Sequence, residues 1–156
     1  MPDGEFSIED PGTADVGRLL QRHLVWAAAQ TPPEDVHALD ENGLMDPSVT
    51  LYGFRRHGEL LAVGALKRID AQHAELKSMH TAQPVRGQGI GRAMLQHLIA
   101  VARQSGYSRL SLETGSMDSF LAARSLYDAA GFEPCKPFGD YRPSRNSTFM
   151  TLRLGS

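Results

Sequence analysis

The sequence predicts one domain of mixed α/β class over residues 1–156, in which a central mixed sheet is flanked by helices. Three observations lead to this prediction. Segments with strand-like alternation of apolar and polar residues are interspersed with segments of helical periodicity. A chain of 156 residues with 41% hydrophobic composition suffices for one core and is short for two ordinary domains. No internal repeat or low-complexity tract divides it.

One short strand and two helices are expected at the N-terminal end. Apolar and polar residues alternate briefly from Glu5 to Asp10. Thr13 is placed to cap an amphipathic helix, which Thr31-Pro32-Pro33 ends. A second short helix is expected from Glu34 to about Leu39.

Three consecutive strands, forming a meander, are expected next. The segments Val49–Arg55 and Leu60–Ile69 are strand-like, and Gly58 between them suits a tight turn. A second turn at Asp70–His73 leads into the third strand, Ala74–Thr81.

Helices and strands alternate in the remaining chain. The predicted elements are a helix from Ile90 that closes at Gly106, a strand Arg109–Glu113, a helix Asp118–Ala130 stopped by Gly131, and strands Phe132–Phe138 and Thr148–Leu154. The complete order is therefore β-α-α-β-β-β-α-β-α-β-β.

A glycine-rich loop joins the third meander strand to the following helix. It reads Arg86-Gly87-Gln88-Gly89-Ile90-Gly91-Arg92. Glycines let the backbone approach a ligand closely, and the free N–H groups of a helix N-terminus attract a pyrophosphate. The dinucleotide fingerprint would need glycine at position 92, and the P-loop would need Gly-Lys followed by Ser or Thr, so neither fits. We interpret the segment as another kind of phosphate-binding loop rather than as a flexible turn.

At these residues the sequence resembles the GNAT acetyltransferases, whose motif [QR]-x-x-G-x-[GA] lies between a strand and a helix. Arg86, Gly89 and Gly91 match that motif. The family pattern A-x-x-L-Y-x-x-x-G-F follows about 30 residues later. It is matched by Ala123, Leu126, Tyr127, Gly131 and Phe132. Together with the element order, the two motifs extend the resemblance over nearly the whole chain.

Further runs place the resemblance in a poorly characterised bacterial branch of the family. They are Ser111–Ser116 and Pro137–Tyr141. One position departs from the pattern, because Phe120 stands where the family often has an asparagine that contacts the cofactor. Ser116 or Ser119 is a candidate replacement.

The resemblance implies a central GNAT-type sheet, acetyl-CoA as co-substrate and direct transfer of the acetyl group to a primary amine of a small or amino-acid-like molecule. The implied cofactor-binding residues are Met79, His80, Thr81, Arg86, Gly87, Gln88, Gly89, Ile90, Gly91 and Arg92. Backbone N–H groups of a bulged strand around Met79 to Thr81 would polarise the thioester carbonyl. Tyr127 would protonate or hydrogen-bond the departing thiolate, although without the resemblance it would be interpreted as a core tyrosine.

An ammonium acceptor must lose a proton before it attacks, which requires a base. Glu75 and Glu113 are the candidates, since a carboxylate on a central strand must be partnered or serve a site. The resemblance favours Glu75, because several members carry a glutamate on the equivalent strand. His80 and water remain as further alternatives.

The acceptor side of the site leaves several interpretations open. Lys77 either forms an ion pair with Glu75 or binds an acceptor carboxylate, a role that an arginine could also have. The candidate arginines are Arg124, Arg142 and Arg145. In the family the segment Thr31–Leu39 would form an acceptor-side wall. Whether Trp26, His37 and Asp40 line a pocket or pack is left open.

Charge and composition limit the partners, the compartment and the metals that we expect for this protein. The formal charge of -2 arises from interspersed acids and bases, and no basic cluster or aromatic array indicates nucleic acid. Neither a signal peptide nor a membrane-spanning run is visible, so a cytoplasmic protein is expected. Cys135 is the only cysteine and the histidines lack ligand spacing, so no metal is expected. A peptide acetylase, a non-catalytic acyl-CoA sensor and a homodimer all stay open.

Overall fold

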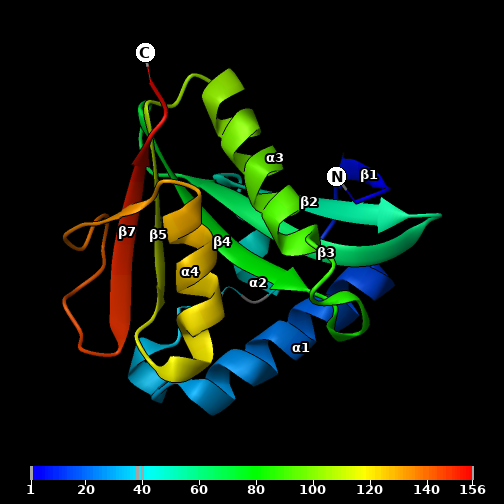
Figure 1. Cartoon of the computed structure of the whole chain (residues 1–156), viewed down its shortest axis with the longest axis horizontal. Coiled ribbons are helices and arrows are strands. Elements are labelled where there is room, and N and C mark those ends of the chain that lie inside the picture. The colour runs from blue at the N-terminus through cyan, green and yellow to red at the C-terminus, as the bar shows by residue number, and fades with distance from the viewer. Residues whose placement is uncertain (1, 38, 40, 156) are drawn as a thin grey trace.

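Seven strands form one mixed sheet in this computed structural model, which describes residues 2–37, 39 and 41–155 (Figure 1). The strands are β1 (Glu5–Ile8), β2 (Val49–Arg56), β3 (Glu59–Arg68), β4 (His73–Thr81), β5 (Arg109–Gly115), β6 (Glu133–Pro134) and β7 (Ser147–Arg153). Their order across the sheet is β1-β2-β3-β4-β5-β7-β6. Among the described residues, β4 and β5 are the one parallel pair. The predicted fold class and element order are thereby confirmed.

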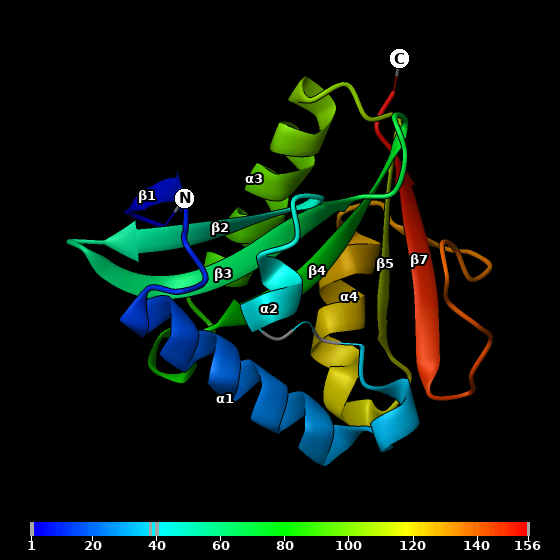
Figure 2. The same ribbon diagram turned by 180° about the vertical axis from the view of Figure 1, so that it is seen from behind.

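Helices cover both faces of the sheet. The helices α3 (Ile90–Gln104) and α4 (Leu121–Ala129) lie on one face, and α1 (Ala14–Gln30) and the short α2 (Glu41–Leu44) lie on the other (Figures 1 and 2). Alternate residues of the strands supply two apolar clusters, one beneath α3 and α4 and one beneath α1 and α2. No helix in the described part of the chain has the length and apolar character needed to cross a bilayer.

The turn between β2 and β3 explains how tightly the hairpin closes. His57 and Gly58 both have positive φ, at 51° and 80°, and Arg56 pairs with Glu59 across the turn. Two residues with positive φ form the turn whose twist matches that of the flanking strands. The predicted hairpin is confirmed, with β3 beginning one residue earlier than expected.

The expected helix from Glu34 to Leu39 is wrong. The structure has a 3-10 turn at Pro33–Asp35 and an extended Val36, and α2 begins only at Glu41. The Asp35 carboxylate accepts hydrogen bonds from Ser144 and Asn146, which tie this segment to the β6–β7 loop. Hydrogen bonds to a distant loop therefore decide the conformation of this segment, in place of the local helical propensity.

Three other expectations need correction. The strand Phe132–Phe138 is reduced to β6, Glu133–Pro134, and one further bond runs from the Cys135 N–H to the Phe149 carbonyl before Pro137, which has no N–H to donate. Residues Asp118–Phe120 form a 3-10 turn before α4 rather than its first turn. Thr13 precedes α1 without a side-chain capping bond, and its carbonyl accepts from Gly17 N–H at 2.8 Å.

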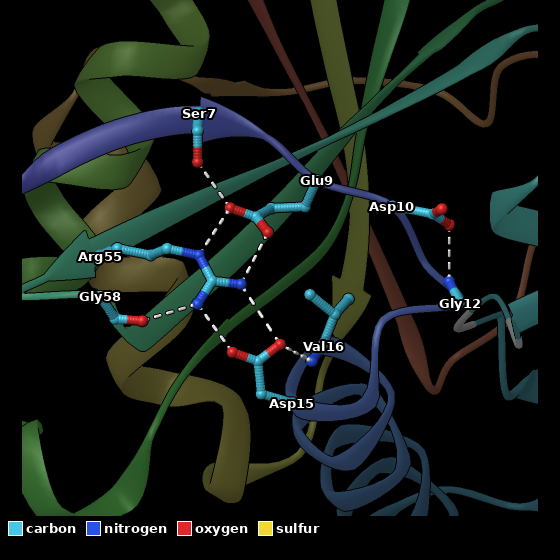
Figure 3. Close-up of polar contacts among 8 residues, drawn as sticks. All are labelled: Ser7, Glu9, Asp10, Gly12, Asp15, Val16, Arg55 and Gly58. Atoms are coloured by element: carbon cyan, nitrogen blue, oxygen red, sulfur yellow. Dashed lines mark hydrogen bonds and ion pairs between the residues drawn. The ribbon is translucent and has the colours of Figure 1, made fainter.

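Arg55 joins three parts of the chain in one cluster of charges (Figure 3). Its guanidinium contacts Glu9 at 2.8 Å and Asp15 at 2.7 Å, and it also donates to the Gly58 carbonyl. The hydrogen bonds from Arg55 hold the pKa values of Glu9 and Asp15 below their usual range. The cluster thus fastens the N-terminal segment and the start of α1 to β2.

We predict that Arg55→Met lowers the free energy of unfolding by about 2 kcal/mol near pH 7, because it leaves two carboxylates without their donor. Carboxylates with lowered pKa stabilise the fold above their unfolded pKa, and this contribution fades as pH falls through the folded pKa. Urea denaturation at about pH 7 and about pH 3 should therefore show a smaller loss in acid.

The control is Arg56→Met, because Arg56 makes one exposed hydrogen bond, to the Asp3 carbonyl. It should cost less than about 0.5 kcal/mol. Equal losses for the two arginines would contradict the role given to the cluster.

Candidate active site

The site is built around a gap between two neighbouring strands. The strands β4 and β5 pair in register over four residues, from His73–Arg109 to Leu76–Leu112. Beyond that point β4 stays paired with β3 up to Thr81, and β5 stays paired with β7 up to Gly115. The two strands thus diverge, and residues from both line a cavity of about 440 Å³.

A bulge in β4 lies at the start of the gap. Val63 pairs with His80 and Ala65 with Lys77, so that Ser78 and Met79 together face Gly64. A Cβ atom on that glycine would lie 2.7 Å from the end of the Leu98 side chain, which would have to shift, so α3 packs closely here. The predicted bulge is confirmed, and it begins at Ser78, one residue before the expected segment.

The glycine-rich loop borders the cavity through Arg86 and Gly91. Gly87 and Gly89 have φ near 80°, at 82° and 81°, a conformation that side chains disfavour. Gly89 precedes α3, and in the described structure no side chain caps its first N–H groups. Arg86 donates from Nε to the Thr81 carbonyl at 3.2 Å, which fixes the loop against the end of β4.

The predicted cofactor-binding residues divide into two groups. Met79, His80, Thr81, Arg86 and Gly91 line the cavity. The others, Gly87, Gln88, Gly89, Ile90 and Arg92, belong to the loop and the first turn of α3 outside that lining. The Ile90 side chain is buried in the core, so this residue can meet a ligand only through its main chain.

Tyr127 lies on α4 and lines the cavity from the α3–α4 face of the sheet. Its ring packs in the core against Phe132, so Tyr127 is both a core residue and a cavity residue. Burial, with a smaller effect of the Glu113 charge, raises the pKa of Tyr127 to about 12. The phenol is therefore protonated at neutral pH.

Glu113 and Glu75 both line the cavity, but their surroundings differ. Burial raises the pKa of Glu113 to about 7, against smaller opposing effects of Ser147 and Lys77. Glu75 Oε2 accepts from Lys77 Nζ at 3.1 Å and from the Tyr141 hydroxyl. One glutamate can thus exchange a proton near neutral pH, and the other is the anion of a buried ion pair.

Tyr141 completes that ion pair from the β6–β7 loop. Lys77 Nζ also donates to the Tyr141 hydroxyl, at 2.7 Å, and lies 5.4 Å from the centre of its ring. Lys77 and Glu75 side chains are 9% and 6% exposed, so the pair is shielded from solvent. Of the two predicted roles of Lys77, the structure contains the ion pair.

Aromatic and imidazole side chains form the walls on the α1 face. Trp26 and Phe120 touch with ring centres 4.9 Å apart, and His23 and His80 with centres 5.0 Å apart. Burial lowers the pKa of both His23 and His80 to about 4, so both imidazoles are neutral at pH 7. His37 also lines the cavity, whereas Asp40 lies outside the described residues.

The remaining predicted residues do not all reach the cavity. Ser119 lines it, whereas Ser116 bonds with Thr148 outside the lining. Arg124 Nη1 donates to the carbonyls of Gly115 and Met117 and so holds the end of β5. The described residues contain no cluster of three or more potential metal ligands.

Sequence reasoning missed three residues of the site. Asp35 was placed in a helix, Ser78 in a regular strand, and Tyr141 in a run noted only for its resemblance to bacterial proteins. Their positions depend on contacts between residues far apart in the sequence. An example is the hydrogen bond between Tyr141 and Glu75, which are 66 positions apart. No local spacing signal could have found them.

Comparison with known proteins gives concordant matches. The model of the family described as Acetyltransferase (GNAT) family matches residues 16–132. The chain is 44% identical over 149 residues to the uncharacterized N-acetyltransferase YsnE of Bacillus subtilis, covering 96% of this chain and 99% of that protein. It is 34% identical over 156 residues to the IAA acetyltransferase of Azospirillum brasilense, covering 99% and 100%.

A solved structure shows the same fold. The GNAT family acetyltransferase of Elizabethkingia anophelis, determined with acetyl-CoA bound, superposes with a TM-score of 0.67 at 21% identity. The superposition covers 96% of this chain and 97% of that one.

We predict that Glu113→Gln stabilises the fold in mild base. The carboxyl ionises at a pKa near 4.5 when unfolded and at about 7 when folded, so the folded state bears the cost of the buried charge above pH 7. Urea denaturation should show a gain of roughly 1–3 kcal/mol at about pH 8 and little change at about pH 4.

The control is Glu133→Gln, on the exposed strand β6, which should change neither value appreciably. A Glu113→Gln gain of equal size at both pH values would show that the buried charge is not its origin.

Proposed function

Since this chain belongs to the acetyltransferase (GNAT) family and is an acetyl-transferring enzyme, we propose that it acetylates a primary amine of a small molecule by direct attack. One observation carries the proposal: Glu113, with a pKa near 7, and Tyr127, which is protonated, line the same cavity. Acetyl-CoA supplies the acetyl group as a thioester, whose carbonyl carbon the amine attacks. The new bond is carbon to nitrogen, and the bond that breaks is carbon to sulfur.

The glycine-rich loop supports acetyl-CoA as the donor. The N–H groups at the start of α3 lack a side-chain cap in the described structure. Gly89, which has a positive φ, places no side chain in front of them. Such a helix N-terminus suits the diphosphate of coenzyme A. Arg86 and Arg92 flank the loop and add positive charge.

Glu113 is the better base of the two glutamates. A base works best when its pKa lies near the operating pH, and the pKa of Glu113 is about 7. Glu75 already accepts two hydrogen bonds on one oxygen, from Lys77 and Tyr141. We assign Glu113 to remove the ammonium proton and Glu75 to position the acceptor wall. His80, with a pKa near 4, is too weakly basic to compete.

Tyr127 is assigned to the leaving sulfur. A phenol with a pKa near 12 is a poor acid toward a thiolate whose conjugate acid has a pKa of roughly 8.5. A hydrogen bond from the hydroxyl to the sulfur is therefore favoured over complete proton transfer. Main-chain N–H groups at the β4 bulge are assigned to the carbonyl oxygen, where negative charge develops.

Hydrogen bonds that join the two sides of the acceptor end favour a small molecule over a peptide. Asp35 of the α1 side accepts hydrogen bonds at 3.0 Å from both Ser144 and Asn146 of the β6–β7 loop. Tyr141 of the same loop bonds to Glu75 on β4. The two walls are thereby joined across the end where a peptide chain would have to leave.

The charges of that end favour a cationic acceptor without a carboxylate. Asp35, Glu75 and Glu113 line it, and the one ammonium among its described residues, Lys77, is paired with Glu75. Arg142 and Arg145 do not line the cavity, and Arg124 is engaged with carbonyls. A buried carboxylate on the acceptor would meet no unpaired cation, which is costly.

The test is thiol release from acetyl-CoA with pairs of amines that differ by one carboxylate, such as phenethylamine and phenylalanine. We expect turnover of amines, with the carboxylate-free member favoured by about 10-fold or more. Preferential acetylation of lysine peptides, or of IAA, for which the Azospirillum brasilense relative is named, would contradict the small amine acceptor. Absence of release with every acceptor would favour an acyl-CoA sensor.

We predict different kinetic signatures for the two assigned residues. In the wild type, kcat/KM should rise with pH through about 7 as Glu113 ionises, and Glu113→Gln should remove this inflection and lower the rate about 100-fold. Tyr127→Phe should lower kcat about 10-fold with unchanged affinity for acetyl-CoA. Tyr107→Phe, outside the cavity lining, is the control. Full activity of Tyr127→Phe would refute the role assigned to the phenol.

We predict that Gly89→Val weakens coenzyme A binding at least about 10-fold in calorimetric titration, because a β-branched residue at φ 81° displaces the α3 N–H groups. Gly106→Val is the matched control, since Gly106 has φ 90° beyond the other end of α3. Both variants should lose similar stability, and only the first should lose affinity. Equal affinities would contradict binding at this loop.

A further inference from the structure

Ser78 combines two features that each cost folding free energy. It is a non-glycine residue with φ of 56°, at the bulge of β4. Its side chain is buried, with the residue 8% exposed, and Oγ has no hydrogen-bond partner in the described structure. A strained backbone and a buried unpartnered hydroxyl are each unfavourable for folding.

Other described residues share one of these features but not both. His57 has a positive φ, in the β2–β3 turn, where the hairpin explains it. Ser147 has a buried hydroxyl, but it acts on the pKa of Glu113 and does not line the cavity. Ser78 lines the cavity, two residues past the last β4–β5 pair. The unused donor therefore lies where the strands part.

We propose that the Ser78 hydroxyl donates a hydrogen bond to the carbonyl oxygen of the acetyl thioester. The inference rests on the proposed function and adds a side-chain donor to the main-chain N–H groups of the bulge. Of the reacting atoms, the oxygen is the one to which no side chain has been assigned: the amine nitrogen carries its own hydrogens, and Tyr127 is assigned to the sulfur. The bond strengthens as negative charge develops on the oxygen, and so assists the reaction itself.

The bulge explains why a serine can serve here. Lys77 lies on the acceptor side with Glu75, whereas Met79 packs toward the core beneath α3. Ser78 is the residue between them, at the change from one face to the other. Its positive φ turns the chain at this point, which a regular strand residue would not do.

The experiment measures binding and needs no acceptor. Calorimetric titration compares acetyl-CoA with S-ethyl-CoA, a thioether of similar size that lacks the carbonyl oxygen. For Ser78→Ala, the Kd of acetyl-CoA should rise about 2–10-fold and that of S-ethyl-CoA should stay unchanged. The free energy of unfolding without ligand should not fall, because the removed hydroxyl has no partner.

Ser78→Gly separates the hydroxyl from the backbone strain. Glycine accepts the positive φ without strain, so this variant should show the same selective loss of acetyl-CoA affinity and retain the fold. The control is His57→Gly, which relieves a positive φ in the β2–β3 turn and should leave the Kd of both ligands unchanged.

Two results would overturn the inference. One is equal weakening of both ligands by Ser78→Ala and Ser78→Gly, which would indicate a structural role of the bulge residue. The other is unchanged binding of both ligands. Failure of the wild type to bind either ligand is a different result, which would overturn the proposed function together with this inference.

Discussion

The separation of β4 from β5 is the constraint on which the rest of the structure depends. After four paired residues, each strand keeps its ladder on its outer side only, and the inner edges face a cavity. Backbone N–H and C=O groups along such edges remain available to a ligand. The bulge opposite Gly64 and the close packing of α3 set where the gap begins. A ligand in the gap can thus be reached from both faces of the sheet.

Three ionisable side chains with different surroundings line the same gap. Tyr127 approaches from the α4 face, where burial keeps its phenol protonated. Glu113 faces the cavity, and the effect of burial on its pKa exceeds the opposing effects of Ser147 and Lys77, whereas Glu75 is held by Lys77 and Tyr141. Two glutamates on neighbouring strands therefore differ in their surroundings, because a loop from elsewhere in the chain supplies Tyr141 to one of them.

Local sequence signals predicted the sheet, the long helices and the glycine-rich loop, because periodicity, glycine and proline act over a few residues. The interpretation failed where distant contacts decide. Asp35 is held by Ser144 and Asn146, so the expected helix at residues 34–39 does not form. The choice between Glu75 and Glu113 as base stays a prediction, and the surroundings that distinguish the two depend on the distant Tyr141. The positive φ of Ser78 likewise follows from the register between β3 and β4.

The most direct test of the account is a crystal structure of the protein with acetyl-CoA. The account predicts the diphosphate at the N-terminus of α3 and the acetyl group in the gap between β4 and β5, with its carbonyl carbon between the side chains of Tyr127 and Glu113. An acetyl group bound outside that gap, or a diphosphate away from residues 86–92, would contradict it.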